Sequence, residues 1–248
     1  MTAHARGTLA LVGAGEYLES MAAVDRLLLA HAAPTGREPR VVCLPTASGA
    51  EGMASWQRWC HLGAAHFARL NASVEALPVV DRAGAEDPGV AATVAAADLV
   101  YFSGGDPHYL EAALRDTPLW KAAGDVFARG GVLAGCSAGA MVLAEWLLQF
   151  GSGFHPSGWS PGLGLIPQSL VVPHFDYRGF DIAVSIGPLR RRLPDEVTIV
   201  GVDEHTALVG RPGEAWEVLG RSSVTLWRRD GRERFESGQV VPWWGTSC

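Results

Sequence analysis

Residues 132–143 read Val-Leu-Ala-Gly-Cys-Ser-Ala-Gly-Ala-Met-Val-Leu, which is an apolar run, a Gly-Xaa-Ser-Xaa-Gly pentapeptide and a second apolar run. This order is typical of a buried strand that turns sharply into a helix, with a serine at the tip of the turn. The turn requires small residues two positions before and after the serine, because strand and helix approach closely. Gly135 and Gly139 meet this requirement. The stretch therefore predicts an α/β fold that presents Ser137 above a sheet.

Cys136 lies next to this serine and is an alternative candidate, because glutamine amidotransferases carry a cysteine nucleophile in a Gly-Xaa-Cys-Xaa-Gly turn. A turn centred on Cys136 would place Ala134 and Ala138 at the flanking positions, which fits less well than two glycines. Ser137 is therefore the predicted nucleophile. The alternative is a tight strand-to-helix crossover without chemistry, and residues elsewhere in the chain must decide between the two.

The composition is that of an ordinary globular protein, with 248 residues, 48% hydrophobic and 19% charged. No repeat, low-complexity segment or long linker divides the chain, so we expect one domain over residues 1–248. The formal charge of −6 argues against nucleic acid or an anionic membrane as partner, since both need a basic face.

The four cysteines have neither metal-ligand nor disulfide-framework spacing, which favours a reducing compartment and predicts no metal site. The amino-terminal residues lack the apolar core of a signal peptide, and no apolar run is long enough to cross a bilayer. We therefore expect a cytoplasmic protein with no membrane partner.

Short apolar or β-branched runs alternate with alanine-rich stretches, which predicts a three-layer, mostly parallel sheet with helices on both faces. The strands expected in the first half are residues 8–12, 40–44, 74–79, 98–102 and 131–134. The helices expected there are residues 18–30, 52–70, 89–96, 107–114, 118–129 and 138–148. In such sheets the loops after the strands' carboxyl ends form the ligand crevice, and Ser137 lies in one of them.

Beyond Gly151 the sequence changes to shorter β-type runs, which we interpret as the remaining strands of the same sheet with a β-rich edge. These runs are residues 170–172, 197–202, 207–209, 216–219 and 224–227. The pair Trp243-Trp244 either pins the carboxyl-terminal tail or lines a homodimer contact, and the sequence does not choose between these.

Gly13 and Gly15 follow the first expected strand and invite comparison with a dinucleotide-binding turn. Leu18 stands where the third glycine of that fingerprint belongs, so a tight turn is the better interpretation. We expect no cofactor.

The loop after the fourth expected strand contains Gly104, Gly105 and Asp106, followed by Pro107. Asp106 and Pro107 suit the start of a helix. Consecutive glycines let the backbone approach a ligand, so the amides of Gly104 and Gly105, with that of Ala138, are candidates for an oxyanion hole.

A nucleophilic serine needs a base, and the histidines downstream are His155, His174 and His205. His174 follows the apolar run 170–172 and so emerges at the carboxyl end of a strand, as Ser137 does. His155 lies in a loop rich in glycine and proline, where a solvated side chain is expected. We predict His174 as the base.

Asp203 and Glu204 follow another buried strand, so either carboxylate is a candidate to orient His174. The alternative for both is a charged hairpin turn. Spacing alone does not decide which of them is the acid.

Four separated segments together resemble peptidase family S51, the dipeptidase E and cyanophycinase family of serine peptidases. They are residues 102–106, 135–140, 174–179 and 202–207. The resemblance implies a class I glutamine amidotransferase-like (flavodoxin-like) fold and a triad in the chain order serine, histidine, acid. It assigns Ser137 as nucleophile, His174 as base and Glu204 as acid, with Asp203 as the less favoured acid.

The same resemblance assigns Asp106, Asp176 and Arg178 to substrate binding, and an arginine there would pair with a substrate carboxylate. Cyanophycinases tend to carry a glutamine and a second arginine where this chain has Pro107 and Phe180. The resemblance therefore implies cleavage of short peptides or isopeptide-like amides without specifying cyanophycin.

Two other functions stay open at this point. An esterase of the α/β-hydrolase fold also uses Gly-Xaa-Ser-Xaa-Gly, but its acid precedes its histidine, which would require Asp181 or Asp195 with His205. A catalytically inactive, amidotransferase-like module that binds a metabolite is the third interpretation.

Overall fold

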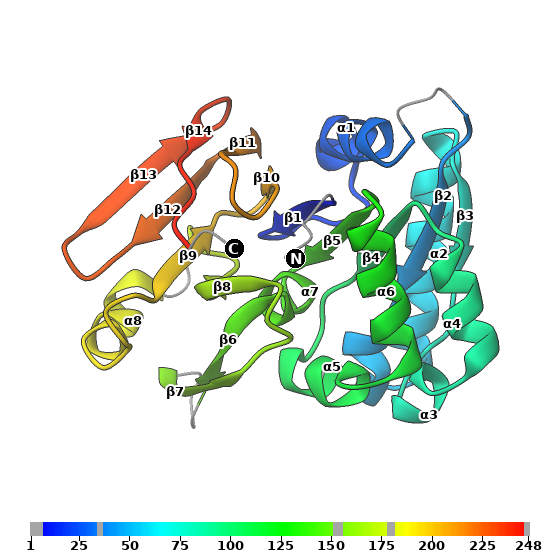
Figure 1. Ribbon diagram of the computed structural model, residues 1–248, viewed down its shortest axis with the longest axis horizontal. Helices are drawn as coiled ribbons and strands as arrows, with labels where there is room; N and C mark the ends of the chain where they lie inside the picture. The colour runs from blue at the N-terminus through cyan, green and yellow to red at the C-terminus, as the bar shows by residue number, and fades with distance from the viewer. Residues whose placement is uncertain (1–6, 34–36, 151–155, 178–181, 246–248) are drawn as a thin grey trace.

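A computed structural model describes residues 7–33, 37–150, 156–177 and 182–245 of the chain. Its strands form two sheets (Figure 1). The first sheet contains β1 (Thr8–Val12), β2 (Arg40–Leu44), β3 (Ser73–Ala76), β4 (Leu99–Phe102), β5 (Val132–Cys136), β10 (Thr206–Gly210), β11 (Trp216–Gly220) and β14 (Val240–Val241). The second sheet contains β6 (Ala144–Phe150), β7 (Pro156–Pro161), β8 (Ile166–Val172), β9 (Thr198–Val202), β12 (Ser223–Trp227) and β13 (Arg232–Glu236).

The helices are connected to these strands mostly as β–α units. They are α1 (Ala22–Ala32), α2 (Met53–Arg69), α3 (Arg82–Ala85), α4 (Pro88–Ala95), α5 (Pro107–Leu114), α6 (Pro118–Ala128), α7 (Ala138–Val142) and α8 (Ile182–Arg190), with short 3-10 turns η1 (Glu19–Met21) and η2 (Thr46–Glu51). Figure 1 shows α2–α6 at one end of the molecule and the second sheet at the other.

The first sheet has the strand order β14-β11-β10-β1-β5-β4-β2-β3. Its strands β1, β5, β4, β2 and β3 are parallel, and β10, β11 and β14 add an antiparallel edge. The parallel α/β fold and its β-rich edge, both predicted from the alternation of apolar runs, are confirmed. The five strands expected in the first half are all present: β1 and β2 have the expected bounds, and the ends of β3, β4 and β5 differ by at most three residues.

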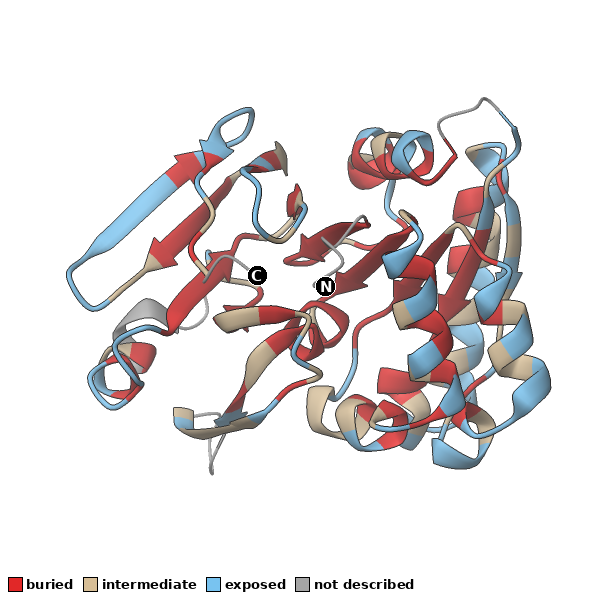
Figure 2. Cartoon of the chain, in the orientation of Figure 1, coloured by how far each residue is buried: buried red, intermediate tan, exposed pale blue. Residues whose placement is uncertain are grey.

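Helices cover both faces of the parallel strands, because successive side chains of a strand point to opposite faces. Leu99 and Tyr101 of β4 pack with α1 and α2, whereas Val100 and Phe102 pack with α4, α5 and α6. The strands are buried along their length, as the continuous red of β1, β4 and β5 shows in Figure 2. This three-layer arrangement leaves the loops at the strand ends as the accessible part of the sheet.

The second half of the chain differs from the expectation of a single sheet. The runs at 207–209 and 216–219 do form the antiparallel edge of the first sheet, as β10 and β11. The other three runs lie in a second sheet of order β13-β12-β9-β8-β6-β7, in which β6, β8 and β9 are parallel. A buried apolar run predicts a strand but carries no information about which strand it will pair with.

The helix expected at residues 138–148 was wrong in its second half. Helix α7 ends at Val142, and Ala144 begins strand β6, which pairs with β7 and β8. Leu147 and Leu148 are fully buried in this strand. A short apolar run fits a buried helix and a buried strand equally well, so only the available partners decide.

Trp243 and Trp244 pack against Trp216 of β11. The ring centroids of Trp216 and Trp243 are 6.1 Å apart, and those of Trp216 and Trp244 are 5.3 Å apart. Trp216 is only 1% exposed and Trp244 9%. The pair therefore holds the end of the described chain against the first sheet.

The turn between β5 and α7 brings two backbones into direct contact. A Cβ atom on Gly135 would lie 2.2 Å from the carbonyl oxygen of Gly139, and one on Gly139 would lie 2.2 Å from that of Phe102. Both distances are far inside van der Waals contact, and the obstructing atoms are backbone. The requirement for glycine at both positions, expected from the sequence, is borne out by this packing.

We expect Gly139→Ala to destabilise the protein by about 1–3 kcal/mol, the usual range for overpacking a core that cannot move aside. Gly124→Ala is the matched control, because a Cβ atom at this helical glycine would meet nothing within 4 Å. It should stabilise the protein by about 0.5–1 kcal/mol by favouring the helix. Urea denaturation of both variants measures this, and equal stabilities would contradict the packing argument.

Candidate active site

Ser137 lies at the tip of the turn between β5 and α7 with φ 51° and ψ −113°, a backbone conformation that non-glycine residues rarely adopt. Such strain persists only where surrounding structure holds it, and it gathers at functional sites. The Ser137 amide donates to the Val12 carbonyl at 3.0 Å, and its carbonyl accepts from the amides of Ala140 and Met141. The turn is thus anchored to β1 on one side and to α7 on the other.

His174 connects Ser137 to Glu204. Its Nε2 lies 3.1 Å from the Ser137 Oγ, and its Nδ1 lies 2.8 Å from the Glu204 Oε1. Both distances are in hydrogen-bonding range. The side chains of His174 and Glu204 are 39% and 36% exposed, so the far end of this chain of hydrogen bonds is open to solvent.

The topology explains why these three residues meet. His174 and Glu204 each follow the carboxyl end of a strand, β8 and β9, and these strands are parallel neighbours in the second sheet. Ser137 follows the carboxyl end of β5 in the first sheet. The Phe175 amide donates to the Val202 carbonyl at 3.1 Å, which holds the two loops of the second sheet together.

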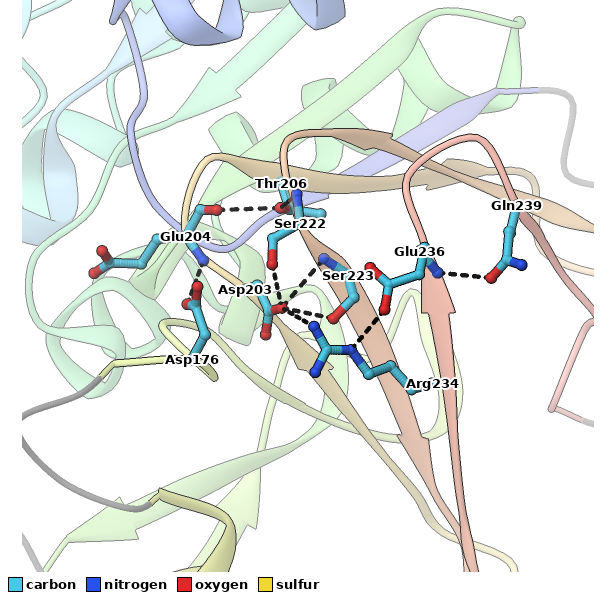
Figure 3. A network of polar contacts seen from close by, with 9 residues as sticks. All are labelled: Asp176, Asp203, Glu204, Thr206, Ser222, Ser223, Arg234, Glu236 and Gln239. Atoms are coloured by element: carbon cyan, nitrogen blue, oxygen red, sulfur yellow. Dashed lines mark hydrogen bonds and ion pairs between the residues drawn. The ribbon is translucent and has the colours of Figure 1, made fainter.

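Asp203 and Glu204 are adjacent, but their side chains point in opposite directions (Figure 3). Asp203 is only 3% exposed, and its Oδ2 accepts from the hydroxyls of Ser222 and Ser223 at 2.7 and 2.6 Å and from the Ser223 amide at 3.1 Å. Arg234 adds an ion pair at 3.8 Å. The Asp203 carboxylate is thus bound at the start of β12 and paired with β13, while Glu204 faces the imidazole of His174.

The three residues assigned to substrate binding have different surroundings. Asp106 caps α5, where its Oδ1 accepts from the amides of His108 and Tyr109 at 2.8 and 3.0 Å. The Oδ1 of Asp176 accepts from the Glu204 amide at 2.8 Å, which fixes the backbone that carries Glu204 (Figure 3). Arg178 lies outside the described residues.

The glycine loop lies beside Ser137, and one of its amides is already engaged. The Gly104 amide donates to the Oε1 of Glu16 at 3.0 Å. A Cβ atom on Gly104 would lie 3.4 Å from the Cβ of Ser137, which places this loop against the predicted nucleophile. Ala138 is the first residue of α7, so its amide has no acceptor within the helix.

Sequence reasoning missed Glu16, which is only 8% exposed. It follows Gly15 in the loop after β1, where the interpretation of the sequence rested on Gly13, Gly15 and Leu18. Its place after the carboxyl end of a strand adjacent to β5 was the available signal.

Cys136 is fully buried, and its thiol donates to the Oε2 of Glu16 at 2.9 Å. Burial raises the pKa of this thiol well above its usual value, and the neighbouring Glu16 carboxylate raises it further. The reactive thiolate is therefore disfavoured. These properties agree with a turn centred on the serine.

His205 does not contact Ser137. Its Nδ1 lies 2.9 Å from the Ser20 Oγ, and its amide donates to the Ala14 carbonyl at 3.1 Å, so it packs over the loop after β1. Asp195 pairs with Arg229 on the surface. The geometry that an α/β-hydrolase esterase would require of His205 is therefore not found, and His155 and Asp181 lie outside the described residues.

A model of peptidase family S51 matches residues 9–217. The chain belongs to peptidase family S51. The resemblance drawn from four separated segments is thereby confirmed, as is the expectation of a serine-type peptidase family.

Relatives and solved structures agree with this family. The chain is 35% identical to a cyanophycinase of Synechococcus elongatus over 159 residues, which are 62% of this chain and 48% of that protein. It is 36% identical to one of Trichormus variabilis, over 62% of this chain and 52% of that protein. The chain thus spans about half the length of these cyanophycinases.

The crystal structure of a peptidase from an acI-B1 Actinobacterium superposes with a TM-score of 0.87 at 36% identity, covering 97% of this chain and 98% of that one. A putative peptidase E of Listeria monocytogenes superposes with a TM-score of 0.59 at 18% identity, covering 87% and 99%. This second likeness concerns the fold alone. The amidotransferase-like fold expected for an S51 member is confirmed.

Within residues 7–33, 37–150, 156–177 and 182–245, no group of three or more histidine, cysteine or acidic side chains is placed to hold a metal ion. None of the helices in these ranges combines the length and hydropathy that a membrane span requires.

Iodoacetamide should modify Cys60 under native conditions and leave Cys136 unmodified. Burial raises the pKa of both thiols, but Cys60 is partly exposed on α2, whereas Cys136 is fully buried and out of reach of the reagent. Peptide mass spectrometry of the alkylated protein measures the modification at each cysteine. Rapid alkylation of Cys136 would contradict the prediction that Ser137, and not Cys136, is the nucleophile.

We expect Asp203→Ala to lower the free energy of unfolding by about 1–3 kcal/mol, because it leaves the buried amide and hydroxyl of Ser223, and the partly buried hydroxyl of Ser222, without their acceptor. Glu204→Ala is the matched control on the adjacent, partly exposed residue, and should change stability by no more than about 0.5 kcal/mol. Denaturant titration compares the two. An equal loss of unfolding free energy in the two variants would contradict the assignment of Asp203 to the fold and Glu204 to the site.

Proposed function

We propose that this protein is a serine peptidase that hydrolyses short peptides or isopeptide-like amides through an acyl-enzyme. The observation that carries the proposal is the continuous chain of hydrogen bonds from Ser137 through His174 to Glu204, at 3.1 and 2.8 Å. A serine hydroxyl is barely nucleophilic at neutral pH, and this arrangement supplies both a base and a group that orients the base.

In the first step, the Ser137 Oγ attacks the carbonyl carbon of the substrate while its proton passes to the His174 Nε2. Glu204 accepts a hydrogen bond from the Nδ1–H, which selects the tautomer with a free Nε2 and stabilises the imidazolium that forms. His174 then gives the proton to the leaving amine. Water, deprotonated by the same imidazole, releases the acyl group and restores Ser137.

Backbone amides at the turn would stabilise the negative oxygen of the tetrahedral intermediate. The Ala138 amide lies at the amino-terminal end of α7, directly after the nucleophile, and the loop of Gly104 and Gly105 lies beside Ser137. Donors aimed at the developing charge in a partly buried site contribute more than they would in water.

For the substrate, we propose a small peptide with a free carboxylate that pairs with Arg178. The S51 segment that begins at His174 carries this arginine two residues after Asp176. Asp106 and Asp176 are engaged with backbone amides, so we assign them a supporting role on the walls of the substrate site rather than the main contact. The names of the cyanophycinase relatives favour isopeptide-like amides as a second class to test.

A panel of α-linked dipeptides and β-aspartyl dipeptides, followed by amine release, tests the proposal. We expect the wild-type protein to hydrolyse members of the panel and Ser137→Ala to hydrolyse none. His174→Ala should lower kcat by about 10²–10⁴-fold through loss of the base. His205→Ala is the matched control and should keep a kcat close to wild type, since His205 bonds to Ser20 instead.

Three outcomes would refute the peptidase mechanism. They are unchanged hydrolysis by Ser137→Ala, a larger loss in His205→Ala than in His174→Ala, and no turnover of any panel member by the wild type. The last, together with a metabolite that co-purifies and is seen by native mass spectrometry, would favour the inactive binding module.

A further inference from the structure

One buried carboxylate beside the nucleophile has no part in the mechanism above. Glu16 is 8% exposed in the loop after β1 and has a hydrogen-bond donor on each carboxylate oxygen. Its Oε1 accepts from the Gly104 amide at 3.0 Å, and its Oε2 accepts from the Cys136 thiol at 2.9 Å. A carboxylate removed from water is costly unless such donors replace the lost hydration.

The two donors come from the two loops on which the proposed chemistry depends. Cys136 immediately precedes Ser137 at the end of β5, and Gly104 belongs to the loop after β4. Strands β1, β5 and β4 are consecutive parallel neighbours, so their loops leave the sheet at the same edge. The single side chain of Glu16 therefore ties together three loops that are far apart in the sequence.

Gly104 is the point at which Glu16 and the nucleophile come nearest to each other. A Cβ atom built on Gly104 would lie 3.0 Å from the Glu16 Oε1 and 3.4 Å from the Ser137 Cβ. Because the Gly104 amide is directed at the carboxylate, the orientation of this peptide relative to Ser137 is set by Glu16. This hydrogen bond is buried, where the local dielectric is low, so it holds the orientation of the peptide firmly.

The engagement of Gly104 also narrows the choice of oxyanion donors. Over the part of the chain that the structure describes, the amides of Gly105 and Ala138 donate to no protein acceptor, whereas that of Gly104 does. The Asp106 amide is held by the Ala47 carbonyl at 2.8 Å, so the loop is fixed on both sides of Gly105.

We propose that Glu16 is a positioning residue for the acylation of Ser137. Its carboxylate holds the loop of Gly104 against the turn that carries the nucleophile, and leaves the amides of Gly105 and Ala138 as the oxyanion donors. This inference rests on the proposed peptidase function. It predicts that Glu16 affects the rate of the chemical step more than substrate binding or folding.

The test compares wild type, Glu16→Gln, Glu16→Asp and Glu16→Ala, using a dipeptide that the wild type hydrolyses and a fluorophosphonate that labels Ser137. Glu16→Ala should lower kcat by about 10–100-fold, the scale of a misplaced oxyanion donor, with KM within about threefold of wild type. Labelling of Ser137 should become slower by a similar factor but still reach one label per chain.

The conservative variants separate positioning from folding. Glu16→Gln keeps an oxygen for the Gly104 amide, so it should recover most of the kcat lost in Glu16→Ala. Glu16→Asp keeps the charge but is one methylene shorter, so it cannot reach both donors and should lose at least about tenfold in kcat. This variant keeps the test decisive if Glu16→Ala does not fold.

If the wild type is active and is labelled at Ser137, two results would overturn the role of Glu16 and leave the peptidase function standing. One is a Glu16→Asp or Glu16→Ala variant with wild-type kcat and labelling rate. The other is a variant in which only the fraction of labelled chains falls, since that is the mark of a folding defect. Failure of the wild type to be labelled or to turn over any dipeptide would instead refute the peptidase function, and this inference with it.

Discussion

The hydrogen bond between the Ser137 Oγ and the His174 Nε2 is the contact on which the rest of the site depends, because it joins two separate sheets. Ser137 is carried by β5 of the first sheet, and His174 by β8 of the second. A distance of 3.1 Å across this junction requires that the carboxyl ends of both sets of parallel strands face the same space. The packing of the two sheets is therefore what brings Ser137 and His174 together, and no single loop does so alone.

Much of the fold could be predicted from local pattern, and the failures share one cause. Buried parallel strands such as β1 and β5 appear as short apolar runs bounded by glycine or proline, which periodicity detects. The run after Val142 has the same texture but forms strand β6 in place of the expected continuation of a helix. The division of the later strands between two sheets was also missed, because pairing partners are long-range information that a local pattern does not contain.

The site shows the same division. Ser137 is marked by its flanking glycines and His174 by its place after a strand, so both could be proposed from residues alone. Spacing alone did not separate Asp203 from Glu204, since both follow the same strand and differ only in which side of the backbone they face, and only the family resemblance favoured Glu204. Glu16 was missed because an acidic residue in a tight turn is common, and only its burial between Gly104 and Cys136 distinguishes it.

The opposed directions of Asp203 and Glu204 have an evolutionary consequence. Asp203 contributes to the stability of the fold, whereas the adjacent Glu204, on our proposal, contributes to the rate of hydrolysis. Selection at position 203 should act through Ser222, which precedes β12, and Ser223, which begins it, so changes there are expected to covary with positions 222 and 223. Selection at position 204 should instead depend on His174. In a copy of this gene that had lost its activity, position 204 would be free to change while position 203 stayed constrained.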